Sequence, residues 1–271
     1  MESTRRRGFT LVELLVVIGI IAVMVGILLP TLNRARRAAR SAQCLSTVRQ
    51  LGIGFIMYSQ QHRRSIPYYS TDDATGLWLG QLRSVYSRVD SSRICPEAWE
   101  PVETSASTNR TGTALNCWGP SNLNFINKQT GSYGINGWLY YYSAPPATIR
   151  RGQPSNDPVA GVLNYPHDER DWYKVPVTKR TADVPVFADS IWVDSWPRPD
   201  DEVPTNLNLG YYNNSPTAGR SMMGRFCIAR HQRAVNVCFA DGHAATVPLP
   251  ELWRLQWNPR YRPPAKLPKM P

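Results

Sequence analysis

One carboxylate, that of Glu13, interrupts an apolar stretch near the N-terminus of the chain. The stretch from Phe9 to Leu32 is long enough to cross a bilayer as a helix, because about 20 apolar residues are needed. A carboxylate at the bilayer centre costs about 2.5 kcal/mol or more, so acids within membranes usually have a partner. Glu13 is therefore a candidate functional residue. The alternative is that Glu13 lies near the lipid headgroups and is only solvated.

A second group of polar residues, His231, Asp241 and His243, contains side chains of types that bind metals. Ten residues of strand span about 33 Å, which would place His231 and Asp241 at opposite ends of one strand. Only a bend or a partner subunit could bring them to one ion, so we expect no metal there. The preferred interpretation is structural: Asp241-Gly242 forms a tight turn, and His231 caps or hydrogen-bonds a strand end.

Catalytic signatures are missing from the sequence, which contains no G-x-S-x-G, H-E-x-x-H, Walker A or G-x-G-x-x-G motif. Cys95 and Cys238 could be nucleophiles, but the four scattered histidines offer them no partner nearby in sequence. Buried thiols or a disulfide are the better interpretation, and Cys95–Cys117 is the favoured pair because both residues flank loops. We therefore predict a protein that is not an enzyme and needs no cofactor. Calcium is allowed only weakly, by the acidic run 200–202 (Asp-Asp-Glu), for which a solvated loop is the better interpretation.

The elements that carry these residues follow from periodicity and turn signals. Helical spacing continues beyond the apolar stretch to about residue 61, and Asn136-Gly137 and Asp241-Gly242 are strong signals for two-residue hairpins. The expected fold class is α+β: a long N-terminal helix, its first half transmembrane, packed on an antiparallel β-sheet head with long loops. The apolar face of its second half is predicted to contain Ala38, Ala42, Leu45, Val48, Gly52, Phe55, Ile56 and Tyr58.

The residues Arg-Gly-Phe-Thr-Leu-Val-Glu-Leu at 7–14 resemble the class III signal of type IV pilins and type II secretion pseudopilins. The resemblance implies that prepilin peptidase cuts between Gly8 and Phe9 and that the new Phe9 amine is N-methylated. It also implies that Glu13 neutralises the terminal amine of a neighbouring subunit during filament assembly. In low dielectric two such charges attract strongly, and each alone is costly.

The C-terminal part resembles a domain that accompanies such signals and is marked by H-x9-D-G, here His231, Asp241 and Gly242. Together the resemblances predict a leader (1–8), a transmembrane half-helix (9–32), an amphipathic half-helix (33–64), a head (65–257) with the H-x9-D-G segment at 231–242, and a flexible tail (258–271).

The formal net charge of +11 could indicate a nucleic-acid partner, but its distribution disfavours that interpretation. Residues 1–8 contribute +2, residues 9–33 contribute −1 and residues 34–64 contribute +7. The other 207 residues contribute only +3, from 21 basic and 18 acidic side chains. The excess therefore belongs to the leader and to the helical stretch beyond the apolar segment.

The expected function is that of a structural subunit of a type II secretion pseudopilus or a type IV pilus-like filament. Its partners would be copies of itself, other pilins or pseudopilins, an inner-membrane assembly platform and prepilin peptidase. It would cross the bacterial inner membrane once, with the leader cytoplasmic and the head periplasmic, before entering a periplasmic or cell-surface filament. Two alternatives stay open: a minor pilin that binds DNA or a surface through residues 34–64 or the aromatic stretch 138–142, and a hydrolase exported by a twin-arginine signal.

Overall fold

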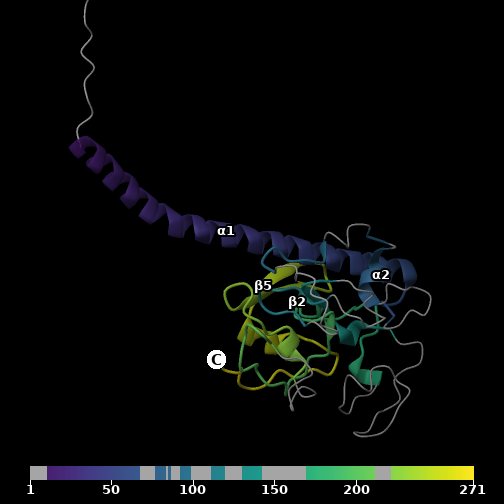
Figure 1. Cartoon of the computed structure of the whole chain (residues 1–271). Helices are drawn as coiled ribbons and strands as arrows, with labels where there is room; N and C mark the ends of the chain where they lie inside the picture. Colours follow the sequence, from purple (N-terminus) through teal and green to yellow (C-terminus); the bar gives the residue numbers. More distant parts are fainter. Residues whose placement is uncertain are drawn as a thin grey trace, which may run out of the picture. The chain divides into compact units, whose positions relative to one another are not determined.

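The computed structural model describes residues 11–67, 77–83, 85–86, 92–98, 111–119, 130–141, 169–210 and 221–271. The chain divides into two units, residues 1–40 and residues 41–271, and the helix α1 (Leu11–His62) contributes to both (Figure 1). The predicted end of the helix near residue 61 is confirmed. The boundary between the two units lies after Arg40, beyond position 32, where we predicted the transmembrane half of the helix to end. We call the unit 41–271 the body.

A five-stranded sheet forms the centre of the body. Its strands are β1 (Tyr133–Asn136), β2 (Pro185–Asp189), β3 (Asp194–Ser195), β4 (Ala234–Phe239) and β5 (Ala244–Pro248), in the spatial order β3-β1-β2-β4-β5. The pairs β1–β2, β2–β4 and β4–β5 are antiparallel, whereas β3 is parallel to β1. The α+β class is confirmed, and the prediction of a purely antiparallel sheet is wrong at β3.

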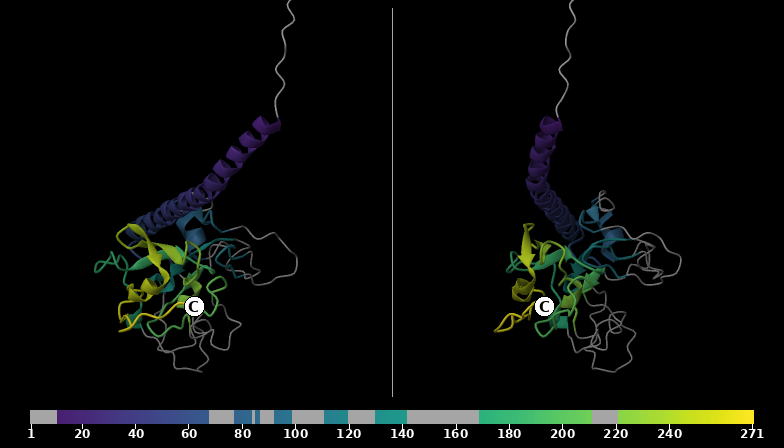
Figure 2. Two further views of the ribbon diagram at one scale, coloured as in Figure 1. Left: turned by 90° about the vertical axis from the view of Figure 1, so that its left-hand side faces the viewer. Right: turned by 60° about the vertical axis from the view of Figure 1, so that its left-hand side comes forward.

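The part of α1 that belongs to the body runs alongside the sheet, as two views of the ribbon show (Figure 2). Gly52 permits this close approach, because a Cβ atom there would lie 2.6 Å from the sulfur of Cys238 in β4. The predicted apolar face is partly confirmed. Ala38 and Ala42 are exposed, and the buried face is Cys44, Val48, Leu51, Gly52, Gly54, Phe55, Tyr58 and Ser59.

The Asp241-Gly242 hairpin is confirmed between β4 and β5. Gly242 adopts a positive φ of 89°, and the N–H of Phe239 donates to the carbonyl of His243 at 2.9 Å. The Asn136-Gly137 hairpin is wrong. The Asn136 side chain is buried and donates to the carbonyls of Pro185 and Trp257, so β1 continues into a short 3-10 helix (Gly137–Leu139) instead of reversing. The hydrogen bonds of the Asn136 side chain to distant residues outweigh the local preference of asparagine for turns.

The remaining helical elements are the short helix α2 (Leu77–Arg83) and the 3-10 turns Glu169–Asp171, Met223–Arg225 and Leu249–Arg254. Residues 258–271, predicted as a flexible tail, contain no helix or strand. Tyr261 is nevertheless buried, and Leu267 and Met270 pack against the core. These apolar contacts attach the C-terminal segment to the body.

Candidate functional site

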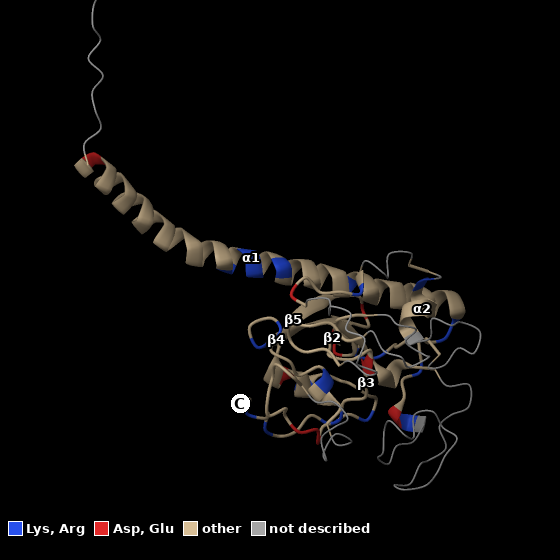
Figure 3. Ribbon diagram, in the orientation of Figure 1, with Lys and Arg blue, Asp and Glu red and all other residues tan. Residues whose placement is uncertain are grey.

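The N-terminal part of α1 exposes an apolar surface. Its large hydrophobic side chains from Leu11 to Leu32 are all at least 44% exposed, and the helix is long and apolar enough to cross a membrane. Glu13 lies in the first turn, where a carboxylate is favoured by the helix dipole, and basic residues follow midway along α1 (Figure 3). Gly8 and Phe9 lie outside the described residues. An exposed apolar surface of this length suits contact with lipid or with other protein chains.

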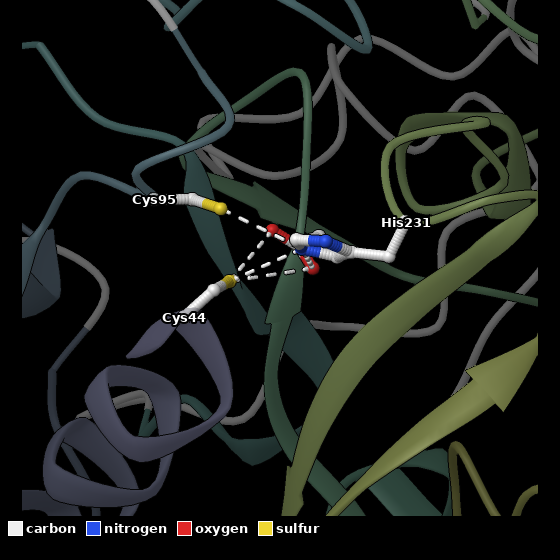
Figure 4. Close-up of side chains that lie close together, drawn as sticks. Cys44, Cys95 and His231 are labelled. Carbon is white, nitrogen blue, oxygen red and sulfur yellow. Dashed lines mark hydrogen bonds and ion pairs between the residues drawn. The ribbon is translucent and has the colours of Figure 1, made fainter. Parts of the chain in front are cut away.

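A second candidate site lies inside the body, where two thiols, a carboxylate and an imidazole meet (Figure 4). Cys44 comes from α1, Cys95 from the segment 92–98, Asp189 from the end of β2 and His231 from the turn before β4. All four residues are buried, and their ligand atoms lie within 4.8 Å of one another. We call these four residues the buried cluster.

The imidazole Nε2 atom of His231 is the common point of the buried cluster. It lies 3.1 Å from Oδ2 of Asp189, 3.2 Å from Sγ of Cys44 and 3.5 Å from Sγ of Cys95. Sγ of Cys44 lies 3.6 Å from Oδ1 of Asp189. One nitrogen therefore faces all three of the other side chains.

The turn that presents His231 is strained. Gln232 and Arg233, the two residues after the histidine, both have positive φ, at 53° and 66°. Two backbone hydrogen bonds between His231 and Ala234 close the turn, at 3.0 and 3.1 Å. Consecutive left-handed residues with side chains are costly, and such strain is concentrated at functional sites. These bonds join the backbone of His231 to Ala234, the first residue of β4.

Asp189 is held from two sides. Its Oδ1 accepts from the Nη1 of Arg230 at 3.0 Å, in an ion pair whose side chains are completely buried, and its Oδ2 accepts from the N–H of Asn236 at 2.8 Å. Burial would raise the pKa of Asp189, but His231, Arg230 and the Asn236 N–H outweigh it and lower the pKa to about 2. The carboxylate is therefore ionised inside the protein.

The pKa of each other member of the buried cluster depends on its neighbours in the cluster. Burial would lower the pKa of His231, yet the neighbouring Asp189 carboxylate raises it to about 10. Burial would also raise the pKa of Cys95, but hydrogen bonds from Cys44 and His231 lower it to about 6. Burial dominates at Cys44 and raises its pKa. A positive charge among these groups would favour both thiolates.

A cysteine-hydrolase triad does not fit this geometry. In such a triad one imidazole nitrogen faces the nucleophile while the carboxylate holds the other nitrogen. Here Cys95 and Asp189 both contact Nε2 of His231. The arrangement instead suits coordination, because one lone pair and three anionic groups can point at a common cation.

Sequence spacing did not reveal this cluster. Cys44 is 187 residues from His231, and Cys95 is 136 residues from it. His231 and Asp241 stay apart, as predicted; Asp241 Oδ1 instead contacts Nδ1 of His243 at 2.6 Å. The five cysteines, all within the described residues, are thiols, so the expected Cys95–Cys117 disulfide is wrong. No local pattern links the four members of the cluster.

The acidic run 200–202 and the aromatic stretch 138–142 were the other candidate sites in the sequence. The Asp201 carboxylate is buried; its Oδ2 accepts from the N–H groups of Arg198 and Met223 at 2.8 and 2.7 Å, and its Oδ1 lies 3.7 Å from Nε of Arg198. In the aromatic stretch, Trp138 and Tyr140 are core residues, so they are not available to a surface partner.

A cleft of about 600 Å³ on the body carries an excess of cationic side chains. Among the described residues, its lining includes the apolar side chains of Trp172 and Val177 but no aspartate or glutamate. The cleft therefore favours an anionic ligand. The cationic residues that line it are Arg170, Lys174, Lys179, Arg180 and Arg262.

Comparison with known families supports the interpretation of the first site. Residues 3–29 match the prokaryotic N-terminal methylation motif. The chain carries a pilin-type N-terminus. Residues 33–87 match a family described as a protein of unknown function, DUF1559. No curated protein and no solved structure matches the chain.

The pilin-type N-terminus indicates processing by prepilin peptidase and, with the apolar part of α1, suggests membrane anchoring. The matches end at residue 87, so the H-x9-D-G interpretation of His231, Asp241 and Gly242 stays a prediction.

Proposed function

We propose that the chain is a structural subunit of a type IV pilus-like filament or a type II secretion pseudopilus, and that α1 drives its assembly. The observation that carries the proposal is the exposed apolar surface of Leu11–Leu32, which overlaps the match to the N-terminal methylation motif at residues 3–29. Moving such a helix from lipid into a filament replaces lipid contacts with contacts between subunits. No catalytic motif occurs in the sequence, so self-association is the chemistry we assign to the chain.

Glu13 supplies the specificity of the assembly in this proposal. Cleavage after Gly8 would create an amine on Phe9, and Glu13 would be the fifth residue of the mature chain. A carboxylate in an apolar layer is stabilised by a cation at short range, since Coulomb attraction is strong where water is excluded. The amine of an adjacent subunit is such a cation, so each added subunit would neutralise one charge.

The topology in this proposal places the leader in the cytoplasm and the body on the other side of the inner membrane. A helix of 52 residues extends about 78 Å, which is more than twice the hydrocarbon thickness of a bilayer. The C-terminal part of α1 is thus available to pack on the body while the N-terminal part crosses the membrane. Prepilin peptidase and an inner-membrane assembly platform would be the partners there.

The test replaces Glu13 by glutamine, which keeps the size of the side chain and removes its charge. We expect normal membrane insertion and cleavage, but at least about a tenfold loss of filaments in the sheared fraction. Glu251→Gln, a surface change in the body, is the matched control and should assemble normally. Normal filaments from Glu13→Gln would contradict the assigned role.

Mass spectrometry of the mature N-terminus tests the processing step independently. A chain that begins with N-methylated Phe9 is the expected product. An intact Met1, or cleavage near Ala42 as for a secretory signal, would contradict the proposal.

The basic cleft favours a second candidate function, a minor subunit that captures an anionic partner such as DNA. Binding through phosphate contacts would weaken steeply as salt is raised. Lys174→Gln combined with Lys179→Gln should then reduce both the affinity and the salt dependence, whereas Arg254→Gln, outside the cleft, should not. If the double lysine variant bound DNA as tightly as Arg254→Gln does, the cleft would not be the DNA-binding site.

A further inference from the structure

We propose that Cys44, Cys95, Asp189 and His231 bind one structural zinc ion in the body of the protein. The inference goes beyond the proposed filament function and does not depend on it. It rests on four buried side chains of the types that bind zinc, brought to one point by four separate segments (Figure 4).

The distances agree with a tetrahedral site. Zinc binds sulfur at about 2.3 Å and nitrogen or oxygen at about 2.0–2.2 Å, so tetrahedral ligand atoms are about 3.8 Å apart for two sulfurs, about 3.6 Å for sulfur with nitrogen or oxygen, and about 3.4 Å for nitrogen with oxygen. The observed separations are 3.2 and 3.5 Å from Nε2 of His231 to the two sulfurs. For one carboxylate oxygen, Oδ2 of Asp189, they are 3.8 Å to Sγ of Cys44 and 3.1 Å to Nε2, and all four ligand atoms lie within 4.8 Å of one another. Small shifts of these side chains would admit the ion.

The convergence on Nε2 favours a cation over a hydrogen-bond network. As an N–H group, Nε2 of His231 has a single proton, yet it faces three neighbouring side chains. As a neutral imidazole, it directs a lone pair at the same space that the two thiols and the carboxylate face. A shared cation satisfies all four groups at once.

Charge balance also favours zinc. Two thiolates, one carboxylate and a divalent ion leave a net charge of −1 on the cluster. The guanidinium of Arg230, completely buried and 3.0 Å from Oδ1 of Asp189, brings the total to zero. Burial of a neutral assembly avoids most of the cost of burying charge.

The groups around the cluster are those that support thiolate and carboxylate ligands. The hydroxyl of Tyr133 donates to Sγ of Cys44 at 3.1 Å, and the N–H of Glu97 donates to Sγ of Cys95 at 3.5 Å. Arg230 and the N–H of Asn236 hold the Asp189 carboxylate. Such outer partners orient metal ligands and tune their affinity.

Four protein ligands leave no open position for water or substrate, so the role we assign is structural. The ion would link α1, the segment 92–98, the end of β2 and the strained turn before β4. It would also offset the strain at Gln232 and Arg233, because ligation fixes the preceding residue.

The test measures zinc in the reduced full-length chain in detergent micelles. We expect one zinc per chain, loss of thermal stability when a chelator removes it, and cobalt binding with the visible bands of a tetrahedral ion and a sulfur charge-transfer band. The conservative Asp189→Asn variant should lower the zinc affinity by at least about tenfold, and Cys44→Ser should remove the charge-transfer contribution of that sulfur. Cys227→Ala removes a buried thiol that contacts Met270 and should bind zinc normally.

Three results would overturn the proposal: folded, reduced wild-type chain that binds neither zinc nor cobalt, equal zinc loss from Cys227→Ala and Cys44→Ser, or a Cys44–Cys95 disulfide in the natively isolated protein. The wild-type measurements decide the question even where a ligand variant does not fold. None of them requires filaments, so this proposal and the filament proposal can fail separately.

Discussion

Replacing Gly52 by alanine perturbs the closest contact between α1 and the sheet. The new Cβ would lie 2.6 Å from Sγ of Cys238 and 3.2 Å from its Cβ. Favourable contacts between such atoms occur at about 3.5–4.0 Å, so one side must move by about 1 Å. Cys238 is completely buried in β4, which pairs with β2 on one side and β5 on the other, so it has little freedom to move.

Two opposing effects set the magnitude of this change. Alanine is favoured over glycine within a helix by about 1 kcal/mol. Overpacking a rigid core costs about 1–3 kcal/mol, so we expect Gly52→Ala to lower the free energy of unfolding of the body by about 1 kcal/mol. In a Cys238→Ala background the sulfur is absent, and we expect the cost of Gly52→Ala to disappear, with a coupling energy of about 1–2 kcal/mol.

Urea unfolding of the full chain in detergent micelles, followed by tryptophan fluorescence, measures these differences. Gly26→Ala is the matched control, because a Cβ there meets nothing within 4 Å and the residue lies outside the body. It should leave the unfolding of the body unchanged. The reasoning is refuted if Gly52→Ala stabilises the body, or if its cost is the same with and without the Cys238 sulfur.

Two further predictions concern buried charges. Arg230→Met should lower the free energy of unfolding by about 3–5 kcal/mol, because it removes the completely buried guanidinium that pairs with Oδ1 of Asp189. Arg254→Met, in a pair with side chains 64% and 40% exposed, should cost less than about 1 kcal/mol, and equal costs would contradict the assignment. Burial raises the pKa of Asp201 to about 7, above its value in the unfolded chain, so the folded state holds the extra proton and stability should fall as pH rises from about 4 to about 7. Burial also raises the pKa of Asp194, to about 6, so Asp201→Asn should reduce this slope rather than abolish it in unfolding experiments across that range. An unchanged pH profile would refute the pKa assignment of Asp201.

Local patterns were sufficient for the parts of the fold that depend on near neighbours in sequence. The apolar run beyond Glu13 specifies a helix that exposes hydrophobic surface, and α1 ends at His62, close to residue 61 where the helical spacing of the sequence ends. The Asp241-Gly242 turn was also predictable, because a positive φ at Gly242 suits glycine and strands of similar length flank it.

Tertiary contacts decided the outcome where a residue has a distant partner. Asn136 could have formed a hairpin turn, but its amide donates to Pro185 and Trp257, and β1 instead pairs with β3 in parallel. The sequence contains no information on these partners within the range of a local motif.

The sequence by itself determined the pilin-type N-terminus, because the residues of the N-terminal methylation motif, 3–29, are contiguous and most of them lie on one apolar helix. Only the tertiary structure decided that Cys44, Cys95, Asp189 and His231 meet, since each lies on a different segment. Their meeting requires the packing of α1 on the sheet, the end of β2 and the strained turn before β4. Coordination depends on atoms being a few ångströms apart, and separations of 136 and 187 residues along the chain do not encode that distance.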